Sequence, residues 1–260
     1  MAPTSAAVLS LVKKICDDLL STCNDISTEG TPQSKALAWL ASDSKLEEYE
    51  EWRRIQRYVL ATVAFSLEGW GTGGVVDWMD GPEDECSWVW GPLEMDEIQC
   101  DSQGRVTHIS FDEDLVGQNM PRDVALLSSS LDELHFCCVH FNGNIPTEVG
   151  MLSKLQHLSL SFNKLSGPVP TELGQLTNLK ELRLYGNRLS GHVPTELGHL
   201  TQLDILKLES TDLTGAMPEE VCRLQKPDGA LGVLVADCEE VQCNCCTHCC
   251  VDGVRPCTAV

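Results

Sequence analysis

A repeat of 24 residues runs through the second half of the chain and restricts the folds that it can adopt. Six columns recur at this spacing over four units, and five of them hold a single residue type throughout. The first members of the columns are Leu131, Leu134, Phe136, Gly143, Pro146 and Leu152. No unit is large enough to cover its own leucines, so units must stack on one another to bury them. The period therefore predicts a solenoid of stacked repeats.

Each unit reads LxxLxLxxNxLxGx[IVM]PxxLGxL, and its parts indicate local structure. The LxL core alternates with period two, which is typical of a short strand with its leucines facing inward. Asn163 and Asn187 follow the strand, where a buried amide can satisfy backbone groups of a bend. The glycine and proline that come next turn the chain and oppose a helix at that point. We therefore expect an α/β fold, a right-handed solenoid whose parallel strands line one concave sheet.

The segment Leu165–Leu200 resembles the plant-type, extracellular leucine-rich repeat, whose hallmark is an LxGxIP segment. The resemblance covers about half of the chain, from Val106 to Leu224, and begins with a degenerate unit at Val106–Pro121. Val139 and Thr211 stand where the second and fifth units should have asparagine, which should weaken the asparagine ladder locally. The resemblance implies ligand or protein recognition, as in receptor-like kinase ectodomains and polygalacturonase-inhibiting proteins.

The flanks of the repeats are expected to cap the solenoid, because its end repeats would otherwise expose leucines. Apolar spacing over Lys45–Glu68 predicts an amphipathic helix packed on the cap, with attachment to a membrane surface as the alternative. A small insertion at Gln225–Gly229 should precede the last strand, Leu231–Cys238. The expected parts are a helical segment that could be flexible (1–44), a helical N-terminal cap (45–105), about five repeats (106–224) and a cysteine-rich C-terminal cap (225–260).

Two N-terminal segments, Thr31–Asp43 and Ile55–Gly71, together with the cysteine-rich tail, look like the flanks of leucine-rich repeat proteins of unicellular algae. In that set a membrane anchor often precedes the cap. Met1–Val12 has a short apolar core with no basic residue before it, which is not the form of a secretory signal. Export is therefore inferred from cysteine usage. We expect an extracellular protein, or one tethered on the lumenal or extracellular side of a membrane.

Fourteen cysteines indicate an oxidising compartment, because a reducing cytosol rarely tolerates such density without metal. Six of them lie between Cys243 and Cys257, where the disulfides of a cap are favoured over a zinc site or a redox CxxC. The resemblance further implies a bridge from Cys86 to Cys100 around Trp88. The candidates for structural disulfides are Cys86, Cys100, Cys222, Cys238, Cys243, Cys245, Cys246, Cys249, Cys250 and Cys257. Four cysteines stay unassigned: Cys16, Cys23, Cys137 and Cys138.

The charge balance and the motif search exclude several function classes. A net charge of −21 repels nucleic acid and anionic lipid, and no apolar stretch reaches the roughly 18–20 residues that cross a bilayer. The motifs GxSxG, HExxH and the phosphate-binding loop do not occur, so we expect no enzyme, no cofactor and no metal. Nine carboxylates between Asp77 and Asp101 lack the spacing of a calcium loop and are expected to be solvated.

The candidate binding site lies on the concave face, toward which residues between and after the inward leucines should point. Large aromatic and basic side chains gather in the middle of these columns and are typical anchors of interfaces. They are His135, His157, Phe162, Arg183, Tyr185 and Lys207. The partner expected for them is a protein or peptide, and an anionic ligand is the other expected class. Two alternatives stay open: a secreted inhibitor of a hydrolase, and a metal-binding or redox protein centred on the cysteine-rich tail.

Overall fold

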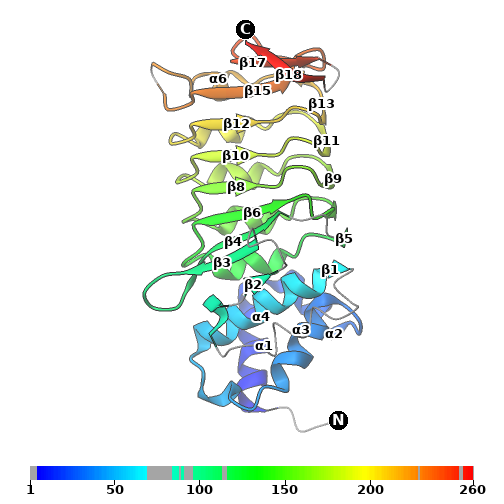
Figure 1. The fold of residues 1–260 in the computed structure, drawn as a ribbon, viewed down its shortest axis with the longest axis vertical. Helices are drawn as coiled ribbons and strands as arrows, with labels where there is room; N and C mark the ends of the chain where they lie inside the picture. Colours follow the sequence, from blue (N-terminus) through cyan, green and yellow to red (C-terminus); the bar gives the residue numbers. More distant parts are fainter. Residues whose placement is uncertain are drawn as a thin grey trace.

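Parallel strands stacked one above the next form the centre of the molecule (Figure 1). The computed structural model describes residues 5–68, 84–87, 89–90, 96–112, 116–227, 229–251 and 254–259. Within them, the main sheet has ten strands, and its two ends are closed by antiparallel pairs. In spatial order the strands are β18 (Val254–Ala259), β17 (His248–Val251), β15 (Val233–Asp237), β12 (Ile205–Lys207), β10 (Glu181–Arg183), β8 (His157–Ser159), β6 (Glu133–Cys137), β4 (Val106–Asp112), β3 (Asp96–Cys100) and β2 (Val89–Trp90).

The register of the main sheet follows the sequence period. Glu181 pairs with His157 on one side and with Ile205 on the other, one repeat away in each direction. The step from Ile205 to Val233 is longer, because the expected insertion at 225–229 comes before β15. Equivalent residues of neighbouring repeats therefore lie side by side across the sheet. The prediction that β15 is the last strand is wrong, since β17 and β18 follow it in the same sheet.

A second, narrower sheet runs along another side of the solenoid, and it was not predicted from the sequence. It is parallel and is built from the glycine-containing segment of each repeat. Its strands are β7 (Asn142–Gly143), β9 (Lys164–Gly167), β11 (Arg188–Gly191) and β13 (Asp212–Leu213). Two small pairs complete the strands, β1 (Leu67–Glu68) with β5 (Val116–Gly117), and β14 (Gly215–Ala216) with β16 (Val241–Gln242).

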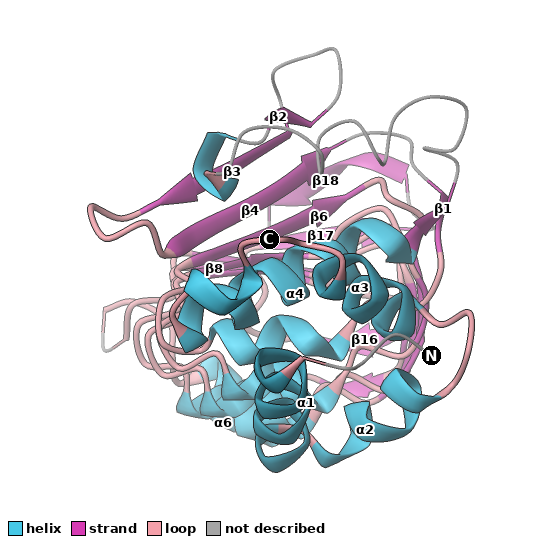
Figure 2. Ribbon diagram, turned by 90° about the horizontal axis from the view of Figure 1, so that it is seen from below, coloured by secondary structure: helices cyan, strands magenta, loops and turns pink. Residues whose placement is uncertain are grey.

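Short helices cover the side of each repeat that lies away from the main sheet (Figure 2). Each begins directly after the proline of its repeat, which suits a position where the missing N–H has no partner to lose. Neighbouring helices pack against each other along the stack. They are η3 (Arg122–Leu127), η4 (Thr147–Met151), η5 (Thr171–Gln175), η6 (Thr195–His199) and α6 (Glu219–Cys222).

The inward leucines of the repeats are fully buried and form one continuous core. Asn163 lies beside this core, where its side chain donates to the carbonyl of Phe136 at 2.7 Å and accepts from the N–H of Phe141 at 2.9 Å. Two repeats further along the chain, Thr211 stands in place of this asparagine. It still donates to the carbonyl of Leu208 at 2.8 Å. Its own N–H donates to Asp237 at 3.1 Å, which links this position to the end of β15.

Helices at the N-terminal end pack under the first repeat (Figures 1 and 2). The longest of them, α4, is buried along almost its whole length from Ile55 to Ala64, polar residues included. Its apolar residues are thus already covered by protein, which removes the reason for the membrane-surface alternative. Cys16 and Cys23, unassigned from the sequence, join two of the other helices in a disulfide. The elements are α1 (Ala6–Asp18), α2 (Leu20–Ser27), α3 (Pro32–Ala41), η1 (Leu46–Glu48) and α4 (Glu51–Ser66).

One carboxylate of the acidic segment is buried, contrary to the expectation that all are solvated. Glu85, in η2 (Glu85–Ser87), is only 1% exposed and lies 2.8 Å from Arg57 and 3.1 Å from Arg53. Both arginines belong to α4. The acidic segment contains no basic residue, so its buried carboxylate pairs with basic residues from another part of the cap. Cys86 and Cys100 form a disulfide next to this network. Trp88 and four of the other eight acidic residues lie outside the described residues.

Four disulfides hold the C-terminal cap. They are Cys222–Cys245, Cys238–Cys249, Cys243–Cys246 and Cys250–Cys257. Every cysteine of the tail is therefore bridged, and none is left as a thiolate that could hold a metal there. In the part of the chain that the structure covers, no helix combines the length and the apolar character needed to cross a membrane.

Candidate functional site

Three of the six predicted side chains surround one pocket on the concave face. His135 on β6, His157 on β8 and Arg183 on β10 meet there, because the strands pair in register. The pocket measures about 250 Å³, and Leu134, Leu158 and Ser159 also line it. Its walls also include two acidic residues, Glu133 and Glu181, that the sequence analysis did not select.

The acidic residues place opposite charges beside the basic ones. Glu133 Oε1 lies 3.0 Å from Nδ1 of His157 and 3.4 Å from Nε2 of His108. Arg183 forms an ion pair of 2.8 Å with Glu181, two residues before it on the same strand. The sequence search was directed at basic and aromatic residues and so passed over both glutamates, although they occupy the same column. The pocket is therefore of mixed charge and suits a ligand that carries groups of both signs.

His135 is the most enclosed of the basic side chains at this site. Burial lowers the pKa of His135 below its ordinary value; Asp112 opposes this shift and Arg183 adds to it. Its Nε2 is shielded from solvent and makes no hydrogen bond within the described residues. Burial thus favours the neutral form of this imidazole over the charged form.

The other three predicted residues form an aromatic cluster next to the pocket. The rings of Phe162 and Tyr185 meet edge to face with centroids 5.0 Å apart, and Nζ of Lys207 lies 5.7 Å from the Tyr185 ring. Phe162 is 46% exposed, an unusual value for so large an apolar side chain. Tyr185 is two residues from Arg183 on the same chain segment, so cluster and pocket are continuous. All six predicted residues thus lie on one face, in two adjoining groups.

Left-handed backbone explains why Phe162 reaches this face. The eighth position of successive repeats has positive φ at Cys138 (62°), Phe162 (53°), Gly186 (70°) and Ser210 (56°). This conformation breaks the alternation of a strand, so consecutive residues need not point to opposite sides. At Gly186 an added Cβ would lie 2.8 Å from the Phe162 ring, so glycine is what lets the ring lie over this turn.

Two thiols lie at the end of the concave face nearest the N-terminal cap. Cys137 and Cys138 are half-buried, unbridged, and have their sulfur atoms 3.0 Å apart. Burial, the neighbouring Cys138 thiol and Asp112 raise the pKa of the Cys137 thiol. A thiol held protonated in this way is a poor nucleophile, so the geometry gives no support to covalent catalysis by Cys137.

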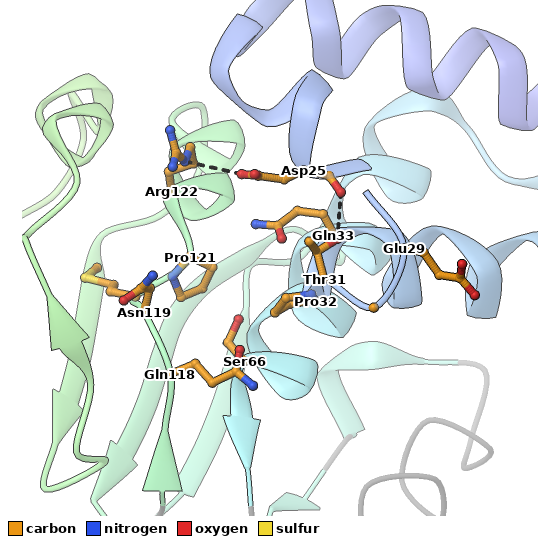
Figure 3. A pocket seen from close by; sticks show the side chains of 12 residues that line it. Asp25, Glu29, Thr31, Pro32, Gln33, Ser66, Gln118, Asn119, Pro121 and Arg122 are labelled. Carbon is orange, nitrogen blue, oxygen red and sulfur yellow. Dashed lines mark hydrogen bonds and ion pairs between the residues drawn. The ribbon is translucent and has the colours of Figure 1, made fainter. Parts of the chain in front are cut away.

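A second cavity, of about 420 Å³, lies between the N-terminal helices and the first repeat (Figure 3). Its walls are mostly polar, and one ion pair crosses from the helices to the repeat. Arg122 lies 3.8 Å from the carboxylate of Asp25, and Thr31 donates to the Asp25 carbonyl at 2.6 Å. None of the six predicted residues lines it. The ion pair between Arg122 and Asp25 links the N-terminal cap to the first repeat, which is a structural role.

The repeats match a family model by sequence. The Leucine Rich Repeat model matches residues 154–176 and 178–200, which are two consecutive units of the predicted period. These two units are leucine-rich repeats, as the sequence pattern predicts. The prediction of a capped, right-handed leucine-rich repeat solenoid with a parallel concave sheet is confirmed. Among the curated proteins, none matches the chain.

Solved structures of plant proteins share the fold of this leucine-rich repeat protein. A plant ice-binding protein is 30% identical, with a TM-score of 0.52 over 64% of this chain and 50% of its own. PEPR1–AtPEP1 is 27% identical, with a TM-score of 0.55 over 68% of this chain and 23% of its own. The BIR3–SERK2 complex from Arabidopsis thaliana, 24% identical with a TM-score of 0.51 over 67% of this chain and 90% of its own, shows the fold alone. The chain thus spans half or less of the length of the first two.

Proposed function

We propose that this leucine-rich repeat protein is a non-enzymatic binding module that recognises a protein or peptide segment on its concave face. The observation that carries the proposal is the continuous surface made by the mixed-charge pocket and the aromatic cluster. An extended segment lying across the strands would meet both. The fold likeness to PEPR1–AtPEP1 supports recognition of this kind.

The chemistry of the surface defines the segment that it fits. Arg183 and His157 can pair with an acidic side chain, while Glu133 and Glu181 can pair with a basic one. Phe162 then contributes an exposed ring against which an apolar or aromatic side chain can pack. We infer a ligand segment with an acidic and a basic residue next to an apolar anchor.

The compartment proposed for the protein is extracellular or lumenal. Six disulfides join all cysteines but two, and such density is stable where thiols are oxidised. Tethering to a membrane is part of the same proposal, on the resemblance to algal proteins whose repeats carry an anchor.

A double substitution tests the binding surface. A phage-displayed library of random peptides is panned on the oxidised full chain, and the affinity of the selected peptides is measured by calorimetry. Arg183→Glu with Tyr185→Ala should weaken binding at least about 100-fold, because it removes one anchor from the pocket and one from the aromatic cluster. Arg188→Glu, an equal change of charge at an exposed position on β11, should leave the affinity unchanged.

The melting temperature of each variant shows whether the fold survives. Selected peptides that bind the double variant as tightly as the unmodified protein would place the binding site elsewhere, on the second sheet or on the caps.

A further inference from the structure

Ligand atoms of three metal-binding residue types converge at the end of the concave face nearest the N-terminal cap. Asp112 and Cys137 are register partners on the neighbouring strands β4 and β6. His135 precedes Cys137 by two residues on β6 and so lies on the same face. One carboxylate oxygen, one ring nitrogen and one sulfur atom all lie within 4.8 Å of one another.

A second sulfur atom lies beside the first. The left-handed backbone of Cys138, with φ at 62°, returns its side chain toward Cys137 instead of to the opposite side of the strand. The two sulfur atoms are 3.0 Å apart. The mutually close donor atoms are those of Asp112, His135 and Cys137, and Cys138 places a further sulfur atom next to this group through its contact with Cys137.

The pairing of the other cysteines makes these two thiols distinctive. The remaining twelve all form disulfides, so the chain is built for a setting in which thiols are oxidised. Bridging of adjacent cysteines strains the backbone, which leaves metal binding as a way to keep both in a defined state. Within the described residues, His135 Nε2 is also shielded from solvent without a hydrogen-bond partner. A buried ring nitrogen without a partner is unfavourable unless something else binds there.

The donor set selects the ion. Sulfur and imidazole donors favour a borderline or soft metal over Ca²⁺ and Mg²⁺, which prefer oxygen ligands. Zn²⁺ takes four donors of these types in tetrahedral geometry, at about 2.0–2.3 Å. Its binding displaces the thiol protons to solvent, and it does not oxidise the thiols. We propose that Asp112, His135, Cys137 and Cys138 bind one zinc ion on the concave face, beside the peptide pocket.

The zinc content of the full chain tests this site. Protein purified with its disulfides intact is stripped with a chelator, reloaded with Zn²⁺ in the absence of air, and measured by elemental mass spectrometry and by competition with a chromogenic chelator. We expect one zinc ion per chain. Co²⁺ in its place should give the near-ultraviolet band of cobalt–thiolate bonds.

Variants on β6 assign the ligands. Cys137→Ser and His135→Gln should each lower the zinc affinity by about tenfold or more, and the cobalt–thiolate band should weaken in Cys137→Ser, where one thiolate remains. His157→Gln removes an imidazole one strand away and should leave zinc binding unchanged. Far-ultraviolet circular dichroism and thermal unfolding of the metal-free variants separate loss of a ligand from loss of the fold.

Three results would overturn the site. The first is a chain that takes up no zinc. The second is zinc that stays bound with equal affinity in Cys137→Ser and His135→Gln, which would place it elsewhere. The third is an intact mass that shows Cys137 and Cys138 joined to each other after reloading with Zn²⁺.

Discussion

At the scale of single residues, the buried asparagines connect one repeat to the next. Asn187 repeats the contacts of Asn163 one unit further on, accepting from the N–H of Leu165 at 3.1 Å and donating to Leu160 at 2.8 Å. This side chain gives buried backbone groups of two repeats the hydrogen bonds that water would provide at a surface. Its removal leaves buried polar groups without partners, and those are costly.

The first prediction concerns Asn163. Replacement by alanine should lower the free energy of unfolding by about 2–4 kcal/mol, because the Phe136 carbonyl and the Phe141 N–H lose their partner in the core. Urea unfolding measures the change. Asn178→Ala is the matched control, since Asn178 also bonds one repeat back, to Ser153 at 2.8 Å, but is exposed. Equal losses in the two variants would contradict the role assigned to the buried amide.

At the scale of elements, the joint between the N-terminal helices and the first repeat depends on one buried carboxylate. Asp123 in η3 is fully buried and accepts hydrogen bonds from Gln33 in α3 at 2.8 Å and from Tyr58 in α4 at 3.0 Å. Burial raises the pKa of Asp123, and the two hydrogen bonds only partly oppose this shift. Three elements therefore meet at a group whose ionisation is disfavoured by its surroundings.

The second prediction concerns the pH dependence at this joint. Because the pKa of Asp123 is higher in the folded state than in the unfolded state, the folded state binds the proton more tightly. The Asp123 contribution is therefore fully present below the ordinary aspartate pKa and is lost as pH rises through the folded value. As pH rises above the ordinary aspartate pKa of about 4, the stability of the unmodified protein relative to Asp123→Asn should fall. Urea unfolding at several pH values measures this difference.

Tyr58→Phe sharpens the same test. It removes a hydrogen bond that stabilises the ionised carboxylate, so in this background the fall should extend to higher pH and be larger in total. If the stability difference between the unmodified protein and the Asp123→Asn variant stays level or rises with pH, burial does not control this carboxylate.

At the scale of the whole molecule, stability is a sum over repeats and the contacts between neighbours. Leu184 lies at the centre of the stack, on the segment that follows β10, and is completely buried. The repeats on both sides supply its surroundings. Damage there should therefore spread along the solenoid further than damage at either end.

The third prediction follows from this arrangement. Leu184→Ala should lower the free energy of unfolding by about 2–5 kcal/mol, because it leaves a cavity in a close-packed core. Hydrogen exchange followed by mass spectrometry should show loss of protection in β8 and β12 as well as in β10. Leu20→Ala is the control, since the Leu20 side chain is 80% exposed in α2 and its loss should cost little. Loss of protection confined to β10 would mean that the repeats do not support one another.

The concave face shows how much of a binding site can be predicted from the residue columns of the repeats. The period equals the strand register, so counting in steps of 24 placed His135, His157 and Arg183 on adjacent strands. The columns did not identify the ion-pair partners of these residues. Glu133 and Glu181 occupy the same columns, but only basic and aromatic residues were selected as anchors. The zinc site escaped for another reason: Cys138 joins it through a left-handed backbone, which a pattern of alternating residues does not reveal.

The repeat pattern was enough to predict the solenoid, its register and the buried leucines, because the same local pattern recurs and each repeat contacts only its neighbours. Parts of the fold that do not recur with the 24-residue period depend on tertiary contacts. The helices α1–α4 close the N-terminal end through contacts between residues far apart in the chain, such as Gln33 with Asp123 and Arg57 with Glu85. The disulfide pairing of the tail is of the same kind. Its cysteines allow many pairings on paper, and only the folded chain brings a given pair of sulfur atoms together.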